Sequence, residues 1–141
     1  MSEFTKEELF DLIVNDIEKY NDYKKTQEEL DLSELDFSNL TLSDVDLSGA
    51  DLSGSSFAEA HFTNVSFADT DLTSADFSRS NLVECDFSGA LLNGTEYSYA
   101  VVSYCNFTDA DLAGAVFNES DLSNSDFSAS NNLNASRFDE E

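Results

Sequence analysis

The sequence predicts an all-β solenoid, and three features carry that prediction: a five-residue period, a twenty-residue period and an amphipathic amino terminus outside both. From Leu32 to Phe127 a large apolar residue occupies every fifth position without a change of phase. An α-helix repeats about every 3.6 residues and a strand alternates its side chains, so neither explains a period of five. A short, fixed period sustained over such a length is typical of solenoid proteins.

Residues twenty positions apart resemble one another. The column that begins at Leu32 is leucine throughout, the column of Phe37 is phenylalanine except for Tyr97, and the column of Leu47 continues as phenylalanine. Only the column of Leu42 is mixed. Like residues at this spacing are expected if four five-residue units complete a coil. We therefore expect about five coils, which at about 4.8 Å each would rise roughly 24 Å.

Each large apolar residue has a characteristic neighbourhood. A small residue lies two positions before it, Asp or Asn lies directly before it, and Ser, Thr or Ala follows, as in GADLSG (49–54), SADFSRSNL (74–82) and DADLAGAVF (109–117). This pattern, A-D/N-L/F-S/T-x, closely resembles the pentapeptide-repeat family. The resemblance implies a right-handed quadrilateral β-helix of four pentapeptides per coil, with the large and the small residue facing inward. Asp, Asn and Ser suit its turns, because their side chains bond nearby backbone groups.

The first segment, residues 1–30, lacks the repeat and is expected to be helical. Thr5 and Glu8 have the spacing of a capping box. An apolar stripe at helical spacing follows: Leu9, Phe10, Ile13, Ile17 and Tyr20. Because an open solenoid exposes its core and its strand edges, we expect this segment to cap the first coil. A partner-binding helix is the alternative.

The repeat proper is assigned to residues 31–130, and residues 131–141 form a third segment. The phase slips by one residue near Asn131, after which Leu133 and Phe138 again stand five apart. This segment is interpreted as a partial sixth coil or a lid, followed by the acidic residues that end the sequence.

The charge balance limits the classes of partner. The formal net charge is −24 at pH 7, and Arg79 is the single Lys or Arg between residues 31 and 130. Such a surface repels nucleic acid and anionic membranes and attracts basic surfaces. No apolar run could span a membrane and no signal peptide is recognised, so a cytoplasmic location is expected. Cys85 and Cys105 stand twenty apart and are expected to be reduced, small core residues in adjacent coils.

No residue set points to catalysis, a cofactor or a metal. His61 is the one histidine, and it stands at the position before Phe62 where the repeat places a polar residue. No serine or cysteine can be identified for which it would act as a general base. The run Asp44-x-Asp46-x-Ser48 begins like a calcium loop, but Ser55 stands at position twelve in place of Glu. The repeat explains the same residues. We therefore expect a protein that is not an enzyme.

One departure from the repeat gives a candidate interaction patch. Apolar residues occupy outward positions that are elsewhere polar, namely Leu91, Tyr99, Val101, Tyr104 and Val116. Clustered exposed apolar groups mark contact surfaces, and tyrosine is frequent in them. Local sequence drift, with the side chains lying flat on the rod, is the alternative.

Two functions remain open at this stage. The first is a structural or protein-interaction module that acts as a monomer or weak homodimer on a protein partner with a basic or apolar surface. The second follows from the resemblance, because some pentapeptide-repeat proteins mimic DNA and protect type II topoisomerases such as DNA gyrase from quinolones or toxins. The short repeat, the absence of an interrupting loop and the absence of a recognisable carboxy-terminal helix depart from that subgroup.

Overall fold

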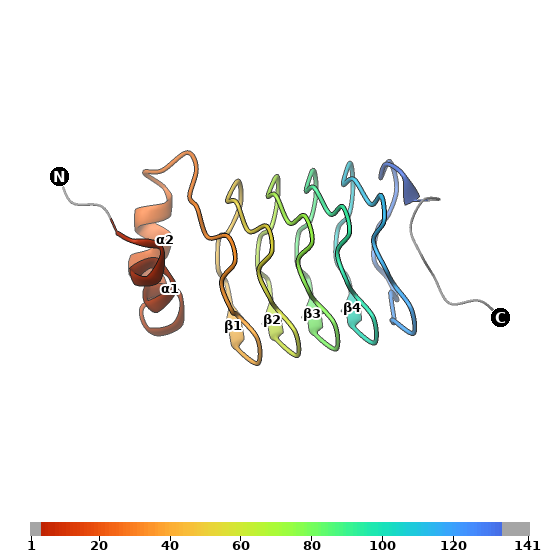
Figure 1. Cartoon of the computed structure of the whole chain (residues 1–141), viewed down its shortest axis with the longest axis horizontal. Helices are drawn as coiled ribbons and strands as arrows, with labels where there is room; N and C mark the ends of the chain where they lie inside the picture. Colours follow the sequence, from red (N-terminus) through yellow and green to blue (C-terminus); the bar gives the residue numbers. More distant parts are fainter. Residues whose placement is uncertain (1–3, 134–141) are drawn as a thin grey trace.

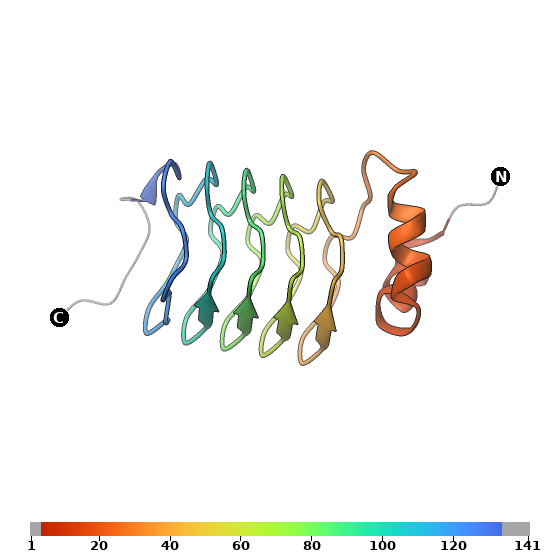
Figure 2. The same ribbon diagram turned by 180° about the vertical axis from the view of Figure 1, so that it is seen from behind.

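The computed structural model of the protein describes residues 4–133. Figure 1 shows an elongated molecule with two helices at one end and a stack of similar coils along the rest of its length. The view from behind shows the same order of parts, so the coils lie side by side along a single axis (Figure 2). Within the described residues, no helix is both long and apolar enough to cross a membrane.

Four short parallel strands form one sheet along the stack. They are β1 (Thr41–Ser43), β2 (His61–Thr63), β3 (Asn81–Val83) and β4 (Val101–Ser103), in the order β1-β2-β3-β4. Each strand pairs with the segment twenty residues later, as in Leu42 with Phe62. Single parallel bridges repeat this spacing on the other sides, from Asp31–Asp51 to Asp111–Asn131.

This register confirms a β-solenoid in which equal positions of the twenty-residue period lie next to each other. The right-handed winding stays a prediction from the family resemblance.

The residues of the five-residue series make the core. Phe57, Phe67, Phe77 and Phe87 are completely buried. Rings one coil apart stack in parallel, with centroids 4.6 Å apart for Phe57 and Phe77 and 4.8 Å apart for Phe67 and Phe87. Rings ten residues apart, on opposite sides of the coil, meet edge to face, as Phe67 and Phe77 do at 5.6 Å. Each buried ring stabilises the fold by about 1.5–3 kcal/mol, so the stability of the rod rests on these columns.

The corners between sides use a left-handed backbone. The residue two positions after each core residue has a positive φ, for example Asn64 at 56° and Gly89 at 69°. Glycine and asparagine accept this conformation readily. At Gly89 a Cβ would lie 2.2 Å from Oδ1 of Asp69, so a side chain there would require that carboxylate to move.

Aspartates before core residues stabilise the turns in the same way along the chain. Oδ1 of Asp51 accepts hydrogen bonds from the backbone N–H of Ser53 at 3.0 Å and from its hydroxyl at 2.7 Å. The corresponding pair Asp71 and Thr73 repeats both contacts at 3.0 and 2.7 Å. Many carboxylates of the repeat therefore have a structural role.

Two helices, α1 (Lys6–Asn15) and α2 (Ile17–Lys24), precede the coils. The predicted capping box of Thr5 and Glu8 is present at the start of α1. Ile13 and Tyr20 are buried with the core of the repeat, and the ring of Phe10 lies 5.1 Å from that of Phe37. The Tyr20 hydroxyl donates to the Asp46 carbonyl at 2.9 Å. The apolar stripe read from the sequence therefore packs against the first coil.

The last part of the repeat is less enclosed. Its backbone still pairs, since Asn106 bridges Asp126, but the side chains of Leu122 and Phe127 are only partly buried. Leu133 is 36% exposed. Phe138 and the acidic residues that follow it, predicted as part of a partial coil or lid, lie outside the described residues.

The two cysteines lie where the twenty-residue spacing predicts. Both are buried and free. The Cys105 thiol donates to the Leu82 carbonyl at 3.5 Å, and the Cys85 thiol to the Phe62 carbonyl at 3.8 Å. The hydrogen bond with Cys105 and burial raise the pKa of the Cys85 thiol. A thiol held in this way is a core residue rather than a nucleophile.

Candidate interaction surface

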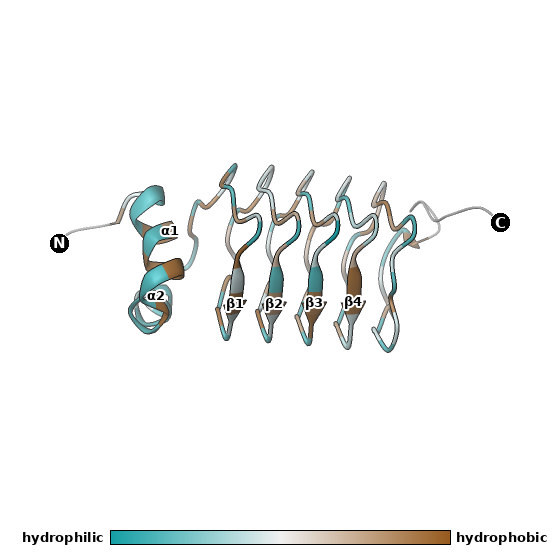
Figure 3. Ribbon diagram, turned by 90° about the horizontal axis from the view of Figure 1, so that it is seen from below, coloured by the Kyte–Doolittle hydropathy of each residue, from teal (hydrophilic) through white to brown (hydrophobic). Residues whose placement is uncertain are grey.

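Three residues of the predicted patch lie together around β4. Tyr99 occupies the corner before the strand, Val101 begins it, and Tyr104 occupies the corner after it. Their exposed fractions are 55%, 41% and 62%. Figure 3 shows β4 in brown, as markedly more hydrophobic than β2. We call Tyr99, Val101 and Tyr104 the β4 face.

The other two residues of the predicted patch belong to different sides of the coil. Leu91 bridges Asp71 and Asp111, in a column that Val101 does not share, and it is 45% exposed. Val116 pairs with Glu96 in a third column and is half-buried. The β4 face therefore consists of the two tyrosines and Val101, and Leu91 lies apart from it.

The backbone at both tyrosines is unfavourable for their size. Tyr99 has φ 63° and Tyr104 has φ 57°. For a residue with a bulky side chain the left-handed conformation costs about 1–2 kcal/mol. Neither ring repays that cost by entering the core, because both are more than half exposed. Every corner of the repeat has this conformation, and Arg79 and Glu84 also carry long side chains there, so it is the exposed rings that distinguish the two tyrosines.

The ring of Tyr99 already holds a cation. The guanidinium carbon of Arg79 lies 4.6 Å from the ring centroid. The two residues are one coil apart, and the Arg79 N–H donates to the Ser98 carbonyl at 2.9 Å. The sequence analysis identified both residues but did not predict a contact between them. Their spacing of twenty residues could have predicted the contact, since it places residues 79 and 99 at the same corner of adjacent coils.

An acidic groove leads toward Tyr104. It has a volume of about 340 Å³ and is lined by the side chains or backbone of Asp44, Val45, Asp46, Asn64, Val65, Ser66, Glu84 and Asp86. Its corner positions are twenty apart, and Tyr104 is the next position in that series. Asn21 of α2 bounds the other end, where its amide donates to the Asp44 carbonyl at 2.9 Å. The groove therefore follows one corner of the rod from Asp44 to Glu84, and Tyr104 occupies the next corner position beyond its lining.

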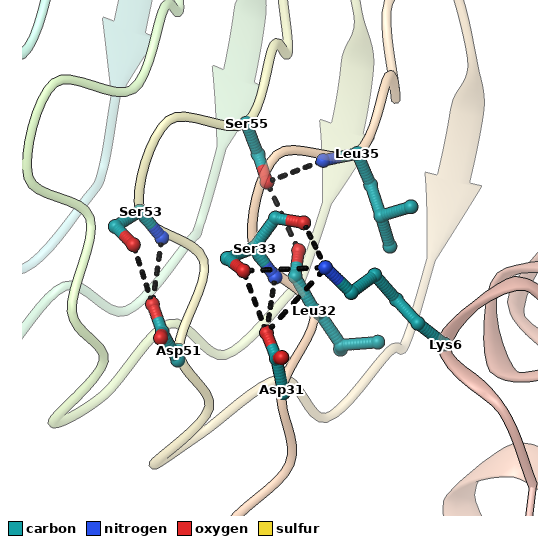
Figure 4. A network of polar contacts seen from close by, with 8 residues as sticks. All are labelled: Lys6, Asp31, Leu32, Ser33, Leu35, Asp51, Ser53 and Ser55. Atoms are coloured by element: carbon teal, nitrogen blue, oxygen red, sulfur yellow. Dashed lines mark hydrogen bonds and ion pairs between the residues drawn. The ribbon is translucent and has the colours of Figure 1, made fainter.

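A second and larger groove, of about 730 Å³, lies on another side. Its lining includes Glu29, Asp31, Asp51, Asp69, Asp71 and Leu91. At Asp31 the carboxylate lies 3.7 Å from Nζ of Lys6, and that ammonium donates to the Ser33 carbonyl at 2.9 Å (Figure 4). The Ser33 hydroxyl and N–H lower the pKa of Asp31. Asp51 and Ser53 repeat the same turn, without a lysine in Figure 4.

The polar residues considered for chemistry are not assembled into a site. His61 is exposed in β2. Oδ1 of Asp46 accepts from the N–H of Ser48 at 3.0 Å and from its hydroxyl at 2.6 Å, so the calcium-like run is a turn of the repeat. Residues 4–133 contain no group of three or more His, Cys, Asp or Glu side chains placed to hold a metal ion.

Comparison with protein families matches most of the chain. A family model for a pentapeptide repeat region matches residues 28–97, and a model for pentapeptide repeats in eight copies matches residues 98–139. No curated protein matches the sequence significantly.

Solved structures of pentapeptide repeat proteins are similar to this chain. HetL of the cyanobacterium Nostoc sp. strain PCC 7120, involved in heterocyst differentiation regulation, is 20% identical over 86% of this chain, with a TM-score of 0.45. The chain spans about half of its length, 48%. A protein of the Arabidopsis thaliana thylakoid lumen is 30% identical over 76% of this chain and 70% of its own, with a TM-score of 0.35. QnrB1, a plasmid-mediated fluoroquinolone resistance protein, is 24% identical over 77% of this chain and 75% of its own, with a TM-score of 0.31.

Proposed function

The chain belongs to the pentapeptide-repeat family, and we propose that it is a non-catalytic protein-interaction module of the cytoplasm. In this proposal it is an acidic rod of about five coils that presents the β4 face to a protein partner. The observation that carries the proposal is the pair Tyr99 and Tyr104, two large exposed rings on adjacent corners of the rod. Exposed aromatic and apolar residues gathered on one face are typical of contact surfaces.

The rest of the rod suits such a role. Parallel ring stacks run through its interior, as between Phe87 and Phe107 at 4.9 Å, and hold the surface in one shape. A rigid surface loses little conformational entropy when it binds. With a net charge of −24, the rod favours partners whose contact surface is basic or apolar. It acts as a monomer or a weak homodimer.

The helices α1 and α2 act as the amino-terminal cap of the rod in this proposal. Ile13 is 1% exposed against the first coil, and the ring of Phe10 covers that of Phe37. An uncovered first coil would offer both apolar surface and unpaired strand edges to other chains. The cap keeps the end of the rod from associating, and so leaves its sides for binding.

The test removes the two tyrosines together. Tyr99→Ser with Tyr104→Ser is expected to abolish capture of specific proteins from a cell extract, and to remove any self-association seen by sedimentation. Val14→Ser is the matched control, because Val14 is an exposed apolar residue (40%) on α1. Leu91→Ser tests whether Leu91 takes part. If the double variant captures the same proteins as the wild type, the β4 face is not the binding surface.

DNA mimicry toward a type II topoisomerase is the second candidate. It is favoured by carboxylates that repeat in register, such as Asp31, Asp51 and Asp71. Against it, five coils span roughly 24 Å, about seven base pairs of duplex at 3.4 Å each. A DNA gyrase supercoiling assay with and without a quinolone tests it. Inhibition or protection at low micromolar protein would support mimicry, whereas no effect up to tens of micromolar would exclude it.

A further inference from the structure

Arg79 and Tyr99 show how one corner of the rod holds a guanidinium. The backbone N–H of Arg79 donates to the Ser98 carbonyl at 2.9 Å, so Tyr99 lies directly beside Arg79 in the next coil. The guanidinium then reaches the face of the ring, 4.6 Å from its centroid. This contact is a cation–π interaction, for which the flat guanidinium of arginine is well suited.

The next corner repeats this arrangement with the opposite charge. The N–H of Glu84 donates to the Ser103 carbonyl at 3.0 Å, which places Tyr104 beside Glu84 as Tyr99 lies beside Arg79. Both residues have left-handed backbones, with φ 56° and 57°. Here the neighbour of the ring is a carboxylate. The corner therefore combines an exposed aromatic ring with a negative charge, but contributes no cation from its own column.

Both groups of this corner are available to an external ligand. Tyr104 is 62% exposed, and in the part of the chain that the structure describes no cation lies over its ring. Glu84 is exposed, and among residues 4–133 no hydrogen bond or ion pair engages its carboxylate. Asp44, further along the same corner, is by contrast held by the Asn64 amide at 2.8 Å.

The surroundings favour a cation from outside the chain. Glu84 and Asp86 line the end of the acidic groove nearest to Tyr104. Arg79 is the only Lys or Arg between positions 31 and 130, and its guanidinium already lies over the ring of Tyr99. A cation at Tyr104 would gain both the ring face and a nearby carboxylate, and its flanking basic residues would follow the groove toward α2.

We propose that Tyr104 and Glu84 form a recognition site for an arginine side chain carried by a basic segment of a protein partner. The proposal rests on the proposed function, because it names the chemistry of the partner at the β4 face. The stack of Arg79 on Tyr99 is its template within the same molecule. Arginine is preferred to lysine because a planar guanidinium can lie on the ring while it donates to the carboxylate.

The experiment compares dye-labelled octa-arginine and octa-lysine peptides by fluorescence anisotropy with the full chain at about 0.15 M salt, where long-range attraction is screened. Wild type is expected to bind octa-arginine about two- to fivefold more tightly than octa-lysine, the ratio that an exposed cation–π contact supplies. Tyr104→Leu keeps apolar area but removes the ring, and the ratio should fall to about one. Circular dichroism confirms that each variant is folded.

Two further variants locate the charge. Glu84→Gln is expected to weaken the binding of both peptides more than Glu34→Gln does. Glu34 is the matched control because it is an exposed acidic residue in a left-handed corner of another column. Arg79→Gln frees the ring of Tyr99 and should increase the preference for arginine. An arginine preference that persists in Tyr104→Leu would overturn the proposal.

The outcome can be separated from that of the proposed function. If Tyr99→Ser with Tyr104→Ser abolishes protein capture while Tyr104→Leu leaves the arginine preference intact, the β4 face binds a partner by other chemistry and only the arginine site is overturned. A wild-type dimer that Tyr104→Leu dissociates would assign the corner to a second copy of the chain, and would also overturn the arginine site. Unchanged capture would overturn the proposed function itself.

Discussion

The first and the last described coils of the solenoid are built from the same repeat but differ in how well their core residues are buried. At the amino-terminal end α1 and α2 bury Ile13 to 1% exposure and Tyr20 to 0% against the first coil. At the other end Leu122 and Phe127 remain partly buried, although Phe107, one coil earlier in the column of Phe127, is fully buried. The repeat therefore decides which residues face inward, while a neighbouring coil or cap decides whether they are shielded from water. Stability in such a rod depends on nearest neighbours.

The largest effect should come from removing a ring between two neighbours. Phe77 is stacked on both Phe57 and Tyr97, at 4.6 and 5.0 Å. Phe77→Ala is expected to lower the free energy of unfolding by about 3–5 kcal/mol, because it leaves a cavity in the middle of a column. Phe127→Ala, in the last part of the described repeat, should cost about 1–2 kcal/mol, because that ring is only partly buried. Urea unfolding of the two variants measures both, and equal costs would contradict the neighbour model.

The next effect concerns the amino-terminal end. Ile13→Ala should lower the stability of the helices and of the first coil by about 2–4 kcal/mol, because the side chain is buried between them. In a chain of nearest-neighbour contacts this loss stays local. Hydrogen exchange should therefore show faster exchange in α1, α2 and the first coil, with little change around β4. Uniform acceleration along the rod would instead mean that the molecule unfolds as one unit.

The sequence predicted the interior well because a rigid period leaves little freedom. Once equal residues recur at twenty, their stacking follows, and Cys85 with Cys105 obeyed the rule as small buried residues. The stripe on residues 9–20 likewise identified the surface that packs on the first coil. These are the parts of the molecule in which a local pattern and the final neighbours coincide.

The surface was harder to predict, for a geometric reason. Residues ten apart in the sequence, such as Leu91 and Val101, belong to different bridge columns because two five-residue units turn two corners. Closeness in sequence therefore does not imply closeness on the rod. Predicting the contact of Arg79 with Tyr99 requires the register between adjacent coils. Predicting the ion pair of Lys6 with Asp31 requires knowing how α1 packs on the first coil, and the repeat pattern does not contain that information.

A smaller effect is expected at Tyr20 of α2. The Tyr20 hydroxyl donates to the Asp46 carbonyl at 2.9 Å, and burial, with a contribution from the Asp46 carboxylate, raises the pKa of Tyr20. Tyr20→Phe should destabilise the protein by about 1–1.5 kcal/mol, because a buried carbonyl loses its donor. Thermal unfolding at a pH near 7 measures the change. Stability equal to the wild type would mean that water replaces the hydroxyl and that the end is less tightly covered than its packing indicates.

The smallest effect should be a gain in stability, and it allows a comparison of Tyr20 in α2 with Tyr97 in the repeat. Tyr97 stands in a phenylalanine column and is fully buried, yet its hydroxyl has no hydrogen-bond partner within the described residues. Burial raises the pKa of this phenol, so the group stays neutral. Tyr97→Phe should stabilise the protein by about 0.5–1 kcal/mol, because it removes an unpaired polar group and preserves the stacks at 5.0 Å on Phe77 and Phe117. The same substitution thus costs stability at Tyr20, whose hydroxyl is paired, and adds stability at Tyr97, whose hydroxyl is unpaired. A loss at Tyr97 would reveal a bound water or a thiol partner at Cys85 or Cys105.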